Sequence, residues 1–305
     1  MRKYDSDYHV HARTENKHAR TESKAYWPMR DVLEQNRRNN VNLKSIGYVS
    51  HFTDFSELEV TKKAREDIRE IISNNEFPEV SLYFAIEASL VIPGNYNGRL
   101  ELGIEKEFIN KMGFAYVLAG AHWPFARRNS FDEWVADYHR QQVYLAKHPL
   151  VDIVAHPWWW AWGEKVGEVY GGGGWNRNFE KVPLEYHEEF AQAAIENKTA
   201  VEINFIACLI EDIMPPEIKK PYLKYLDFLN QKGVTFALGS DCRAEIVPSN
   251  YEPAWKIMDN LRIDPDRLWH PFQSKTWQRN EPEWKKNYLG RERNTETSRR
   301  IVRLN

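Results

Sequence analysis

Tyr116-Val-Leu-Ala-Gly-Ala-His122 is a short apolar run that ends on a histidine. Six more short apolar runs lie along the chain, separated by helical patterns, at residues 8–12, 44–50, 82–87, 151–155, 200–205 and 234–239. Such runs are typical of parallel strands that are covered on both faces. Seven strand–helix repeats therefore predict a parallel α/β barrel. A doubly wound open sheet is the alternative, although no glycine-rich fingerprint follows the first run to indicate dinucleotide binding.

Helix signals lie between these runs. Ser56-Glu-Leu-Glu59 and Ser130-Phe-Asp-Glu133 are capping-box patterns, and each predicts the start of a helix. Apolar residues recur at helical spacing after both of them. A third helix, with apolar residues from Tyr222 to Leu229 on one face, is expected to end near Gly233.

The chain is expected to form one domain, because no linker divides it. Residues 1–264 make the barrel, and residues 265–305 form a polar C-terminal extension of the same domain. Residues 157–183 are rich in tryptophan, carry four glycines at 171–174, and are too long for an ordinary strand–helix connection. Because this segment begins directly after His156, we expect it to lie over the site. It is either a lid or a hydrophobic staple that closes one end of the barrel.

Composition narrows the class of protein. The 305 residues carry 42 Lys and Arg against 44 Asp and Glu, a net charge of −2, so the basic footprint of a nucleic-acid-binding protein is missing. Two cysteines, Cys208 and Cys242, cannot form a disulfide framework, which favours a reducing compartment. No apolar run reaches the length of about 18 residues that a membrane span needs. No apolar run follows the basic residues at the start, as it would in a secretory signal. We therefore expect a cytoplasmic protein with a small-molecule substrate and no membrane partner, and leave its oligomeric state open.

Residues with metal-binding side chains stand at the ends of the apolar runs. His9 and His11 are two positions apart in the first run, so both imidazoles project to one side of a strand. Five later runs end on or shortly before a further possible ligand, and these ligands are His51, Glu87, His122, His156 and Asp241. Barrel enzymes build their sites at the carboxyl ends of the strands. The pattern therefore predicts a metal site at that face.

The order and spacing of motifs between residues 5 and 245 resemble those of the polymerase-and-histidinol-phosphatase (PHP) superfamily. The matching motifs are Asp7-Tyr-His9-Val-His11, Ile46-Gly-Tyr-Val-Ser-His51, Ala85-Ile-Glu87, His122, His156 before a proline, Val201-Glu202-Ile-Asn204 and Gly239-Ser-Asp241-Cys-Arg243. The resemblance implies a distorted (β/α)7 barrel of the TIM type that binds two or three metal ions.

The resemblance also implies which residues hold two divalent ions. The implied ligands of the first ion are His9, His11, Glu87 and Asp241. The implied ligands of the second ion are Glu87, His122 and His156, so that Glu87 bridges the two. Mixed imidazole and carboxylate ligands suit zinc, iron or manganese, and the sequence does not choose among these metals.

Two positions depart from the family pattern. Arg243 stands where the last motif has a histidine, and Ser50 stands where the second motif has an aspartate. In relatives with three metals, that histidine holds the third ion together with residues matched here by His51 and His18. A guanidinium cannot ligate a cation, so we expect two metals rather than three. Arg243 would instead grip an anionic group of the substrate, unless it turns away to Glu245 or solvent.

The expected function is that of a metal-dependent hydrolase, with a phosphoesterase favoured that uses a metal-bound hydroxide on a small anionic substrate. Its candidate catalytic residues are Asp241, Arg243 and His51. Glu202 and Asn204 alternate on their strand, and they either contact substrate, hydrogen-bond to the ligands or fill a polar layer of the barrel. One alternative is an amidohydrolase-like enzyme that cleaves C–N or C–O bonds on a similar binuclear site. Another is a non-catalytic binding domain that metal stabilises.

Overall fold

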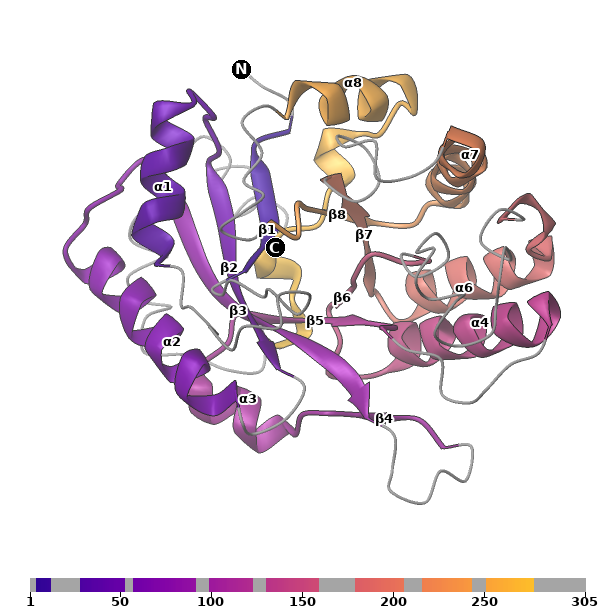
Figure 1. Cartoon of the computed structure of the whole chain (residues 1–305), viewed down its shortest axis with the longest axis horizontal. Coiled ribbons are helices and arrows are strands. Elements are labelled where there is room, and N and C mark those ends of the chain that lie inside the picture. The colour runs from indigo at the N-terminus through magenta and orange to yellow at the C-terminus, as the bar shows by residue number, and fades with distance from the viewer. Residues whose placement is uncertain are drawn as a thin grey trace.

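The computed structural model describes residues 4–11, 28–52, 57–91, 99–122, 130–158, 179–205, 216–242 and 251–276. Within them, parallel strands hydrogen-bond in chain order around a barrel, with helices outside it (Figure 1). The barrel strands are β1 (Ser6–His11), β2 (Ser45–Phe52), β3 (Ser81–Val91), β5 (Tyr116–Gly120), β6 (Ile153–Val154), β7 (Ala200–Asn204) and β8 (Phe236–Gly239). Each apolar run of the sequence forms one of these strands, which confirms the prediction of a parallel α/β barrel.

The barrel is nearly closed between its first and last strands. The main-chain N–H of His11 donates to the carbonyl oxygen of Cys242 at 2.9 Å, and Val10 and Cys242 form a parallel bridge. The short strand β4 (Glu101–Leu102) pairs antiparallel with the end of β3 and lies off the barrel path. A doubly wound sheet reverses its strand order at a switch point and stays open. Because the strands here follow chain order and β1 meets β8, the open-sheet alternative is wrong.

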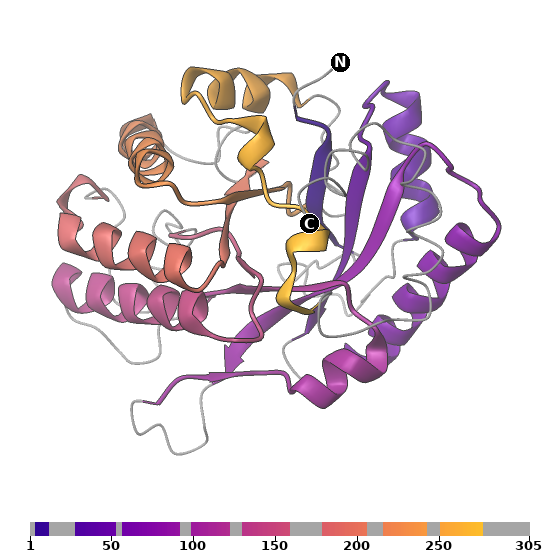
Figure 2. The ribbon, with the colours of Figure 1, turned by 180° about the vertical axis from the view of Figure 1, so that it is seen from behind.

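Helices surround the barrel on its outer side (Figure 1 and Figure 2). They are α1 (Met29–Arg38), α2 (Leu58–Ser73), α3 (Lys106–Met112), α4 (Phe131–Lys147), α6 (Leu184–Glu196), α7 (Pro216–Lys232) and α8 (Glu252–Asn260). The Ser130 hydroxyl accepts the main-chain N–H of Glu133 at 3.3 Å, which confirms the helix start predicted there. At the first box, Glu57 rather than Ser56 precedes α2 and makes no side-chain cap. None of the described helices is long and apolar enough to cross a membrane.

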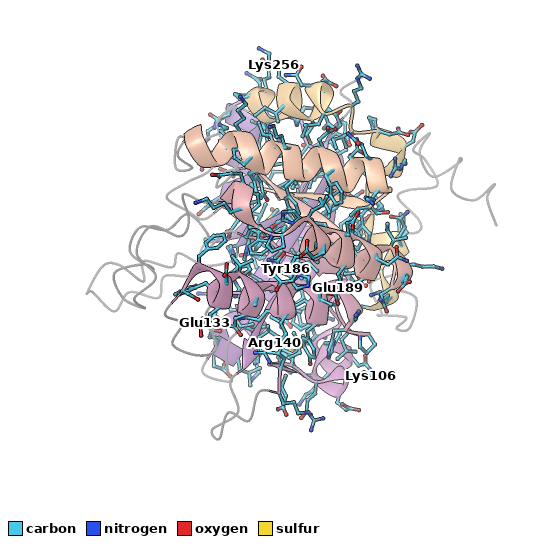
Figure 3. The ribbon with its side chains drawn as sticks, turned by 90° about the vertical axis from the view of Figure 1, so that its right-hand side faces the viewer. Lys106, Glu133, Arg140, Tyr186, Glu189 and Lys256 are labelled. Atoms are coloured by element: carbon cyan, nitrogen blue, oxygen red, sulfur yellow. The ribbon has the colours of Figure 1, made fainter. Side chains whose placement is uncertain are left out.

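Helices α4 and α6 lie side by side on one flank, as Figure 3 shows by the positions of Arg140, Tyr186 and Glu189. His139 of α4 pairs with Glu189 at 2.8 Å and stacks on Tyr186 with ring centroids 4.1 Å apart. This histidine therefore has a structural role in the packing of α4 against α6.

Only the two ends of the tryptophan- and glycine-rich segment lie among the described residues. Trp158 is buried and stacks on Tyr138 of α4 with ring centroids 5.2 Å apart. Phe179 meets the Trp158 ring edge-on at 5.8 Å. The choice between a lid and a staple falls on residues 159–178, outside the described part of the chain.

The chain after α8 returns to the barrel through two short 3-10 helices, Pro265–Arg267 and Pro271–Gln273. The N–H of buried Trp269 donates to the carbonyl oxygen of Phe236 at 2.7 Å, next to β8. The Ser274 hydroxyl donates to the carbonyl oxygen of Ala115 at 2.9 Å, next to β5. The described part of the expected C-terminal extension therefore packs against the amino-terminal ends of barrel strands.

Asp152 is buried and accepts hydrogen bonds from this returning segment. Its carboxylate accepts the main-chain N–H groups of Val117 at 3.0 Å and Lys275 at 2.6 Å, and the hydroxyl of Thr276 at 2.9 Å. Asp152→Ala leaves three donors, two of them fully buried, without this acceptor, so we expect the free energy of unfolding to fall by about 3 kcal/mol. Urea unfolding of the metal-free protein measures this change.

Thr276→Val is the matched control for Asp152→Ala. It removes one donor and leaves the carboxylate its two main-chain partners, so it is expected to cost only about 1 kcal/mol. Equal losses in the two variants would contradict the role given to Asp152.

His187 on α6 lies in an aromatic cluster, with its ring centroid 4.7 Å from that of Tyr225 and 5.9 Å from that of Phe179. Burial, with a smaller effect from His139, lowers the pKa of His187 to about 4. Between that value and the unfolded value of about 6.5, the unfolded chain binds the proton and stability rises with pH. His187→Phe keeps a ring but removes the proton site, so we expect its stability to change less steeply with pH, by up to about 1.4 kcal/mol per unit.

Chelated protein unfolded in urea at several pH values tests the His187 prediction. Tyr225→Phe is the control, because it alters the same cluster and removes no group that titrates in this range. The prediction fails when wild type and His187→Phe have the same slope.

Candidate metal centre

Glu87 on β3 lies at the centre of a cluster of imidazoles and is 1% exposed. Histidines from other strands and strand ends contact both of its carboxylate oxygens. On the Oε2 side, Nε2 atoms lie at 3.4 Å (His9), 3.3 Å (His11) and 3.9 Å (His51). On the Oε1 side, Nε2 atoms lie at 2.9 Å (His122) and 3.0 Å (His156). The structure thus brings five of the six predicted site histidines to the predicted bridging carboxylate, and the sixth, His18, lies outside the described residues.

Asp241, just after β8, belongs to the Oε2 side of Glu87. Its Oδ1 lies 2.8 Å from His11 Nε2 and 3.7 Å from His9 Nε2. His9, His11 and Asp241 form one group whose possible ligand atoms all lie within 4.8 Å of one another. His51, Glu87 and His122 form a second such group. Two groups that could each hold a metal ion therefore adjoin at Glu87.

Two buried atoms at the centre of this arrangement have the separation that a shared metal ion requires. Within the described residues, His9 Nε2 and Glu87 Oε2 are buried without a hydrogen-bond partner, yet they face each other at 3.4 Å. Two ligand atoms on one tetrahedral ion, with bonds of about 2.1 Å, lie about 3.4 Å apart. A buried nitrogen and a buried carboxylate oxygen at this separation fit a shared cation, and so do His11 Nε2 and Glu87 Oε2 at 3.3 Å.

Burial and neighbouring charges shift the pKa values of these groups in opposite directions. Burial lowers the pKa of His122 to about 4, so its imidazole is neutral near pH 7, the form that binds metal. Burial would also lower the pKa of His9, but the carboxylates of Glu202, Glu87 and Asp241 outweigh it and raise the value well above normal. Burial favours a protonated Glu87, yet His9 and His122 hold its pKa well below the usual range. Glu87 is therefore ionised, as a bridging ligand must be.

Two candidate ligands have an unusual backbone conformation. His156 has a φ of 28° and Asp241 a φ of 55°, and each follows the end of its strand. Residues with side chains rarely adopt this left-handed region, and such strain persists where the surroundings fix it. The turns aim the ring of His156 at Glu87 and the carboxylate of Asp241 at His11, a local detail that the sequence pattern did not indicate.

Two glycines leave space for the ligands. A Cβ atom at Gly120 would lie 2.6 Å from Cε1 of His156. At Gly239, a Cβ atom would collide with the carboxylate of Glu202 and lie 2.7 Å from Cβ of His9. Both positions therefore require glycine for close approach of the site residues.

Several site residues have supporting roles that the sequence reasoning missed. Asp7 belongs to the first motif but its carboxylate accepts main-chain N–H groups of His9 at 3.1 Å and Ser240 at 2.9 Å. The hydroxyl of Tyr251 donates to it at 2.8 Å. Buried Glu57 lies with Oε2 at 3.8 Å from His51 Nδ1. Glu57 precedes a helix instead of ending a strand, so the strand-end pattern could not find it.

Of the remaining predicted site residues, two are described by the structure and two are not. Glu202 and Asn204 are buried on β7, and the Asn204 amide donates a long hydrogen bond to Glu202 at 3.4 Å. His18 and Arg243 lie outside the described residues, so the predictions of a missing third metal and of an arginine that grips the substrate stay predictions.

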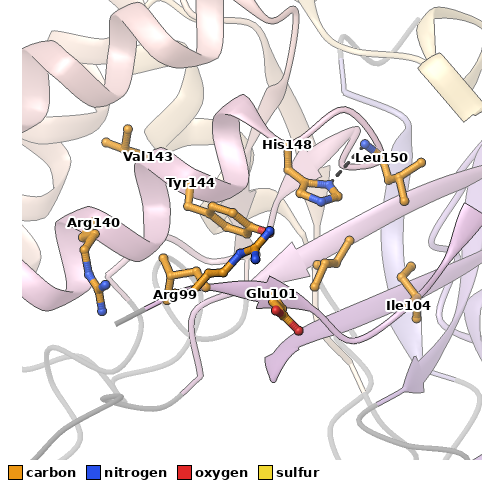
Figure 4. Close-up of a pocket in the computed structure, with 10 residues that line it drawn as sticks. Arg99, Glu101, Ile104, Arg140, Val143, Tyr144, His148 and Leu150 are labelled. Atoms are coloured by element: carbon orange, nitrogen blue, oxygen red, sulfur yellow. Dashed lines mark hydrogen bonds between the residues drawn. The ribbon is translucent and has the colours of Figure 1, made fainter. Parts of the chain in front are cut away.

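A separate groove of about 630 Å³ lies on the flank of the barrel, between the β4 region and α4 (Figure 4). Its lining includes Arg99, Glu101, Tyr144 and His148, and none of the candidate ligands. Arg140 at its edge is ion-paired with Asp137 at 2.9 Å. The groove is therefore distinct from the metal centre.

No family model matches the chain, and no curated protein sequence matches it. Among solved structures, the chain is similar to N-isopropylammelide isopropylaminohydrolase from Burkholderia multivorans ATCC 17616, at 10% identity and a TM-score of 0.36, over 93% of this chain and 74% of that one. It is also similar to an HpcH/HpaI aldolase from Desulfitobacterium hafniense DCB-2, at 11% identity and a TM-score of 0.30, over 69% of this chain and 82% of that one. Similarities this weak carry no argument about function.

Proposed function

We propose that this chain is a metal-dependent phosphoesterase of the PHP type that acts on a small anionic substrate. The observation that carries the proposal is the cluster of five histidines and Asp241 around both oxygens of buried Glu87. Two divalent cations held about 3.5–4 Å apart, when bound, polarise a phosphoryl oxygen and lower the pKa of a water molecule. The proposed ions are zinc, iron or manganese, and two are proposed instead of three.

Exposure indicates where a substrate would reach this centre. The side chains of Asp241 and His122 are each 13% exposed, whereas His9 and Glu87 are at most 1% exposed. A phosphate group would therefore approach past Asp241 and His122, with the deeper ligands kept from water. This placement supports the proposed catalytic role of Asp241 beside its role as a ligand.

Two other residues have proposed catalytic roles. His51 Nε2 faces the centre at 3.9 Å from Glu87 Oε2, and we assign it the proton that the leaving oxygen needs. Arg243, two positions after Asp241, is proposed to grip the phosphate oxygens in bidentate fashion. Neither role requires a third cation.

The experiment that tests the proposal is a substrate panel on the metal-reconstituted protein, with phosphomonoesters, phosphodiesters, lactones and amides. We expect phosphoester turnover that a chelator abolishes and added metal restores. Asp152→Asn, at the opposite end of the barrel, is the control for loss of stability and should retain turnover. Hydrolysis of amides or lactones alone would contradict the phosphoesterase proposal, and no hydrolysis at full metal content would contradict any hydrolase.

A further inference from the structure

Glu202 on β7 is a buried carboxylate, 1% exposed, that the ligand set does not include. Its Oε1 lies 2.7 Å from Nδ1 of His9, and its Oε2 accepts the main-chain N–H of His156 at 2.6 Å. His9 lies on the Oε2 side of Glu87 and His156 on the Oε1 side. We propose that Glu202 is a positioning residue that orients one ligand of each metal ion.

The contact with His9 decides which imidazole nitrogen is available for metal. A carboxylate oxygen accepts hydrogen bonds, so Nδ1 of His9 is the donor in its 2.7 Å contact with Glu202 Oε1. The other nitrogen, Nε2, is then the one available to a metal ion, and it faces Glu87 Oε2 at 3.4 Å and Asp241 Oδ1 at 3.7 Å. A carboxylate behind a histidine ligand fixes both the tautomer and the ring orientation.

The contact with His156 acts on the backbone instead of the ring. His156 has a φ of 28°, a conformation that a residue with a side chain adopts only when its surroundings hold it. The hydrogen bond from its N–H to Glu202 Oε2, at 2.6 Å, stabilises this conformation. The His156 ring then reaches Glu87 Oε1 at 3.0 Å.

The neighbouring strand β8 leaves space for this carboxylate. Gly239 on β8 faces Glu202, and a Cβ atom there would collide with Oε1. Since Oε1 of Glu202 contacts His9 on β1 and Oε2 accepts from His156 after β6, a glutamine cannot replace it. Its single oxygen could serve only one of the two donors, and its NH2 group would oppose the other.

Zinc affinity tests the inference without any substrate. The inference rests on the metal centre of the proposed function but not on the bond cleaved, so failure of the substrate panel leaves it standing. Competition with a chromophoric chelator should show that Glu202→Gln weakens zinc binding at both sites by about 10- to 100-fold. The absorption spectrum of the cobalt-substituted protein should change as well, because the ligand geometry changes.

The matched control is Asp152→Asn, which alters a buried carboxylate with three donors at the other end of the barrel. It should lower stability and leave zinc affinity and the cobalt spectrum as in wild type. Glu202→Asp, whose shorter side chain cannot reach both donors, is measured beside Glu202→Gln. If a variant is unfolded without metal, the zinc concentration that refolds it gives its affinity. Wild-type affinity and spectrum in the Glu202 variants, or an equal loss in Asp152→Asn, would overturn the inference.

Discussion

Replacing Glu87 with glutamine is expected to remove most of both metal ions and to lower turnover by about a thousandfold, equivalent to about 4 kcal/mol. Imidazoles lie against both oxygens of Glu87, with those of His9 and His11 on the Oε2 side and those of His122 and His156 on the Oε1 side. Glutamine offers one oxygen and no charge, and its NH2 group would point at imidazole nitrogens on one side. Two cations would then face each other with less negative charge between them.

Metal content by elemental analysis, measured together with phosphoester turnover, tests the Glu87 prediction. Asp152→Asn serves again as the control, since it should keep two metals despite its lower stability. Two fully bound metals and an unchanged rate in Glu87→Gln would remove the bridging role from Glu87.

Asp241→Asn is expected to remove one metal and keep the other. Asp241 Oδ1 lies 2.8 Å from His11 and 3.7 Å from His9, on the Oε2 side of Glu87. The His122 and His156 side would keep its ligands. We expect the metal content to fall from two ions to one, and turnover to fall by about a hundredfold or more, because a binuclear site needs both cations to clamp the substrate.

Cys242→Ala is the matched control for Asp241→Asn. Cys242 is the next residue, is buried, and joins β1 to β8 through its carbonyl oxygen, which the substitution retains. This variant should keep both metals. The assignment of Asp241 would be wrong if Asp241→Asn bound two ions, or if Cys242→Ala lost one.

The strands and the candidate ligands were predictable because both follow local rules. Residues two apart on a strand share a face, so the sequence placed His9 and His11 together. Parallel strands also bring their carboxyl ends to one face of a barrel, so Glu87, His122 and His156 were expected near each other. Both rules use only the position of a residue along its own strand.

The supporting contacts of Glu202 and Tyr251 were not predictable, because each joins residues that are far apart in the chain. His9 and Glu202 are separated by 193 positions, and Asp7 and Tyr251 by 244. No periodic pattern marks such a pair. The left-handed backbone of His156 and Asp241 also carried no signal, since histidine and aspartate do not require it. Sequence therefore indicated which side chains meet, but not what holds them there.

Anomalous diffraction from crystals of the metal-reconstituted wild-type protein tests the central claim most directly. We expect two anomalous peaks, one on each side of Glu87. The first should contact His9, His11 and Asp241, and the second His122 and His156. A single peak, peaks away from Glu87, or a third fully occupied ion on His18 and His51 would contradict the two-metal centre.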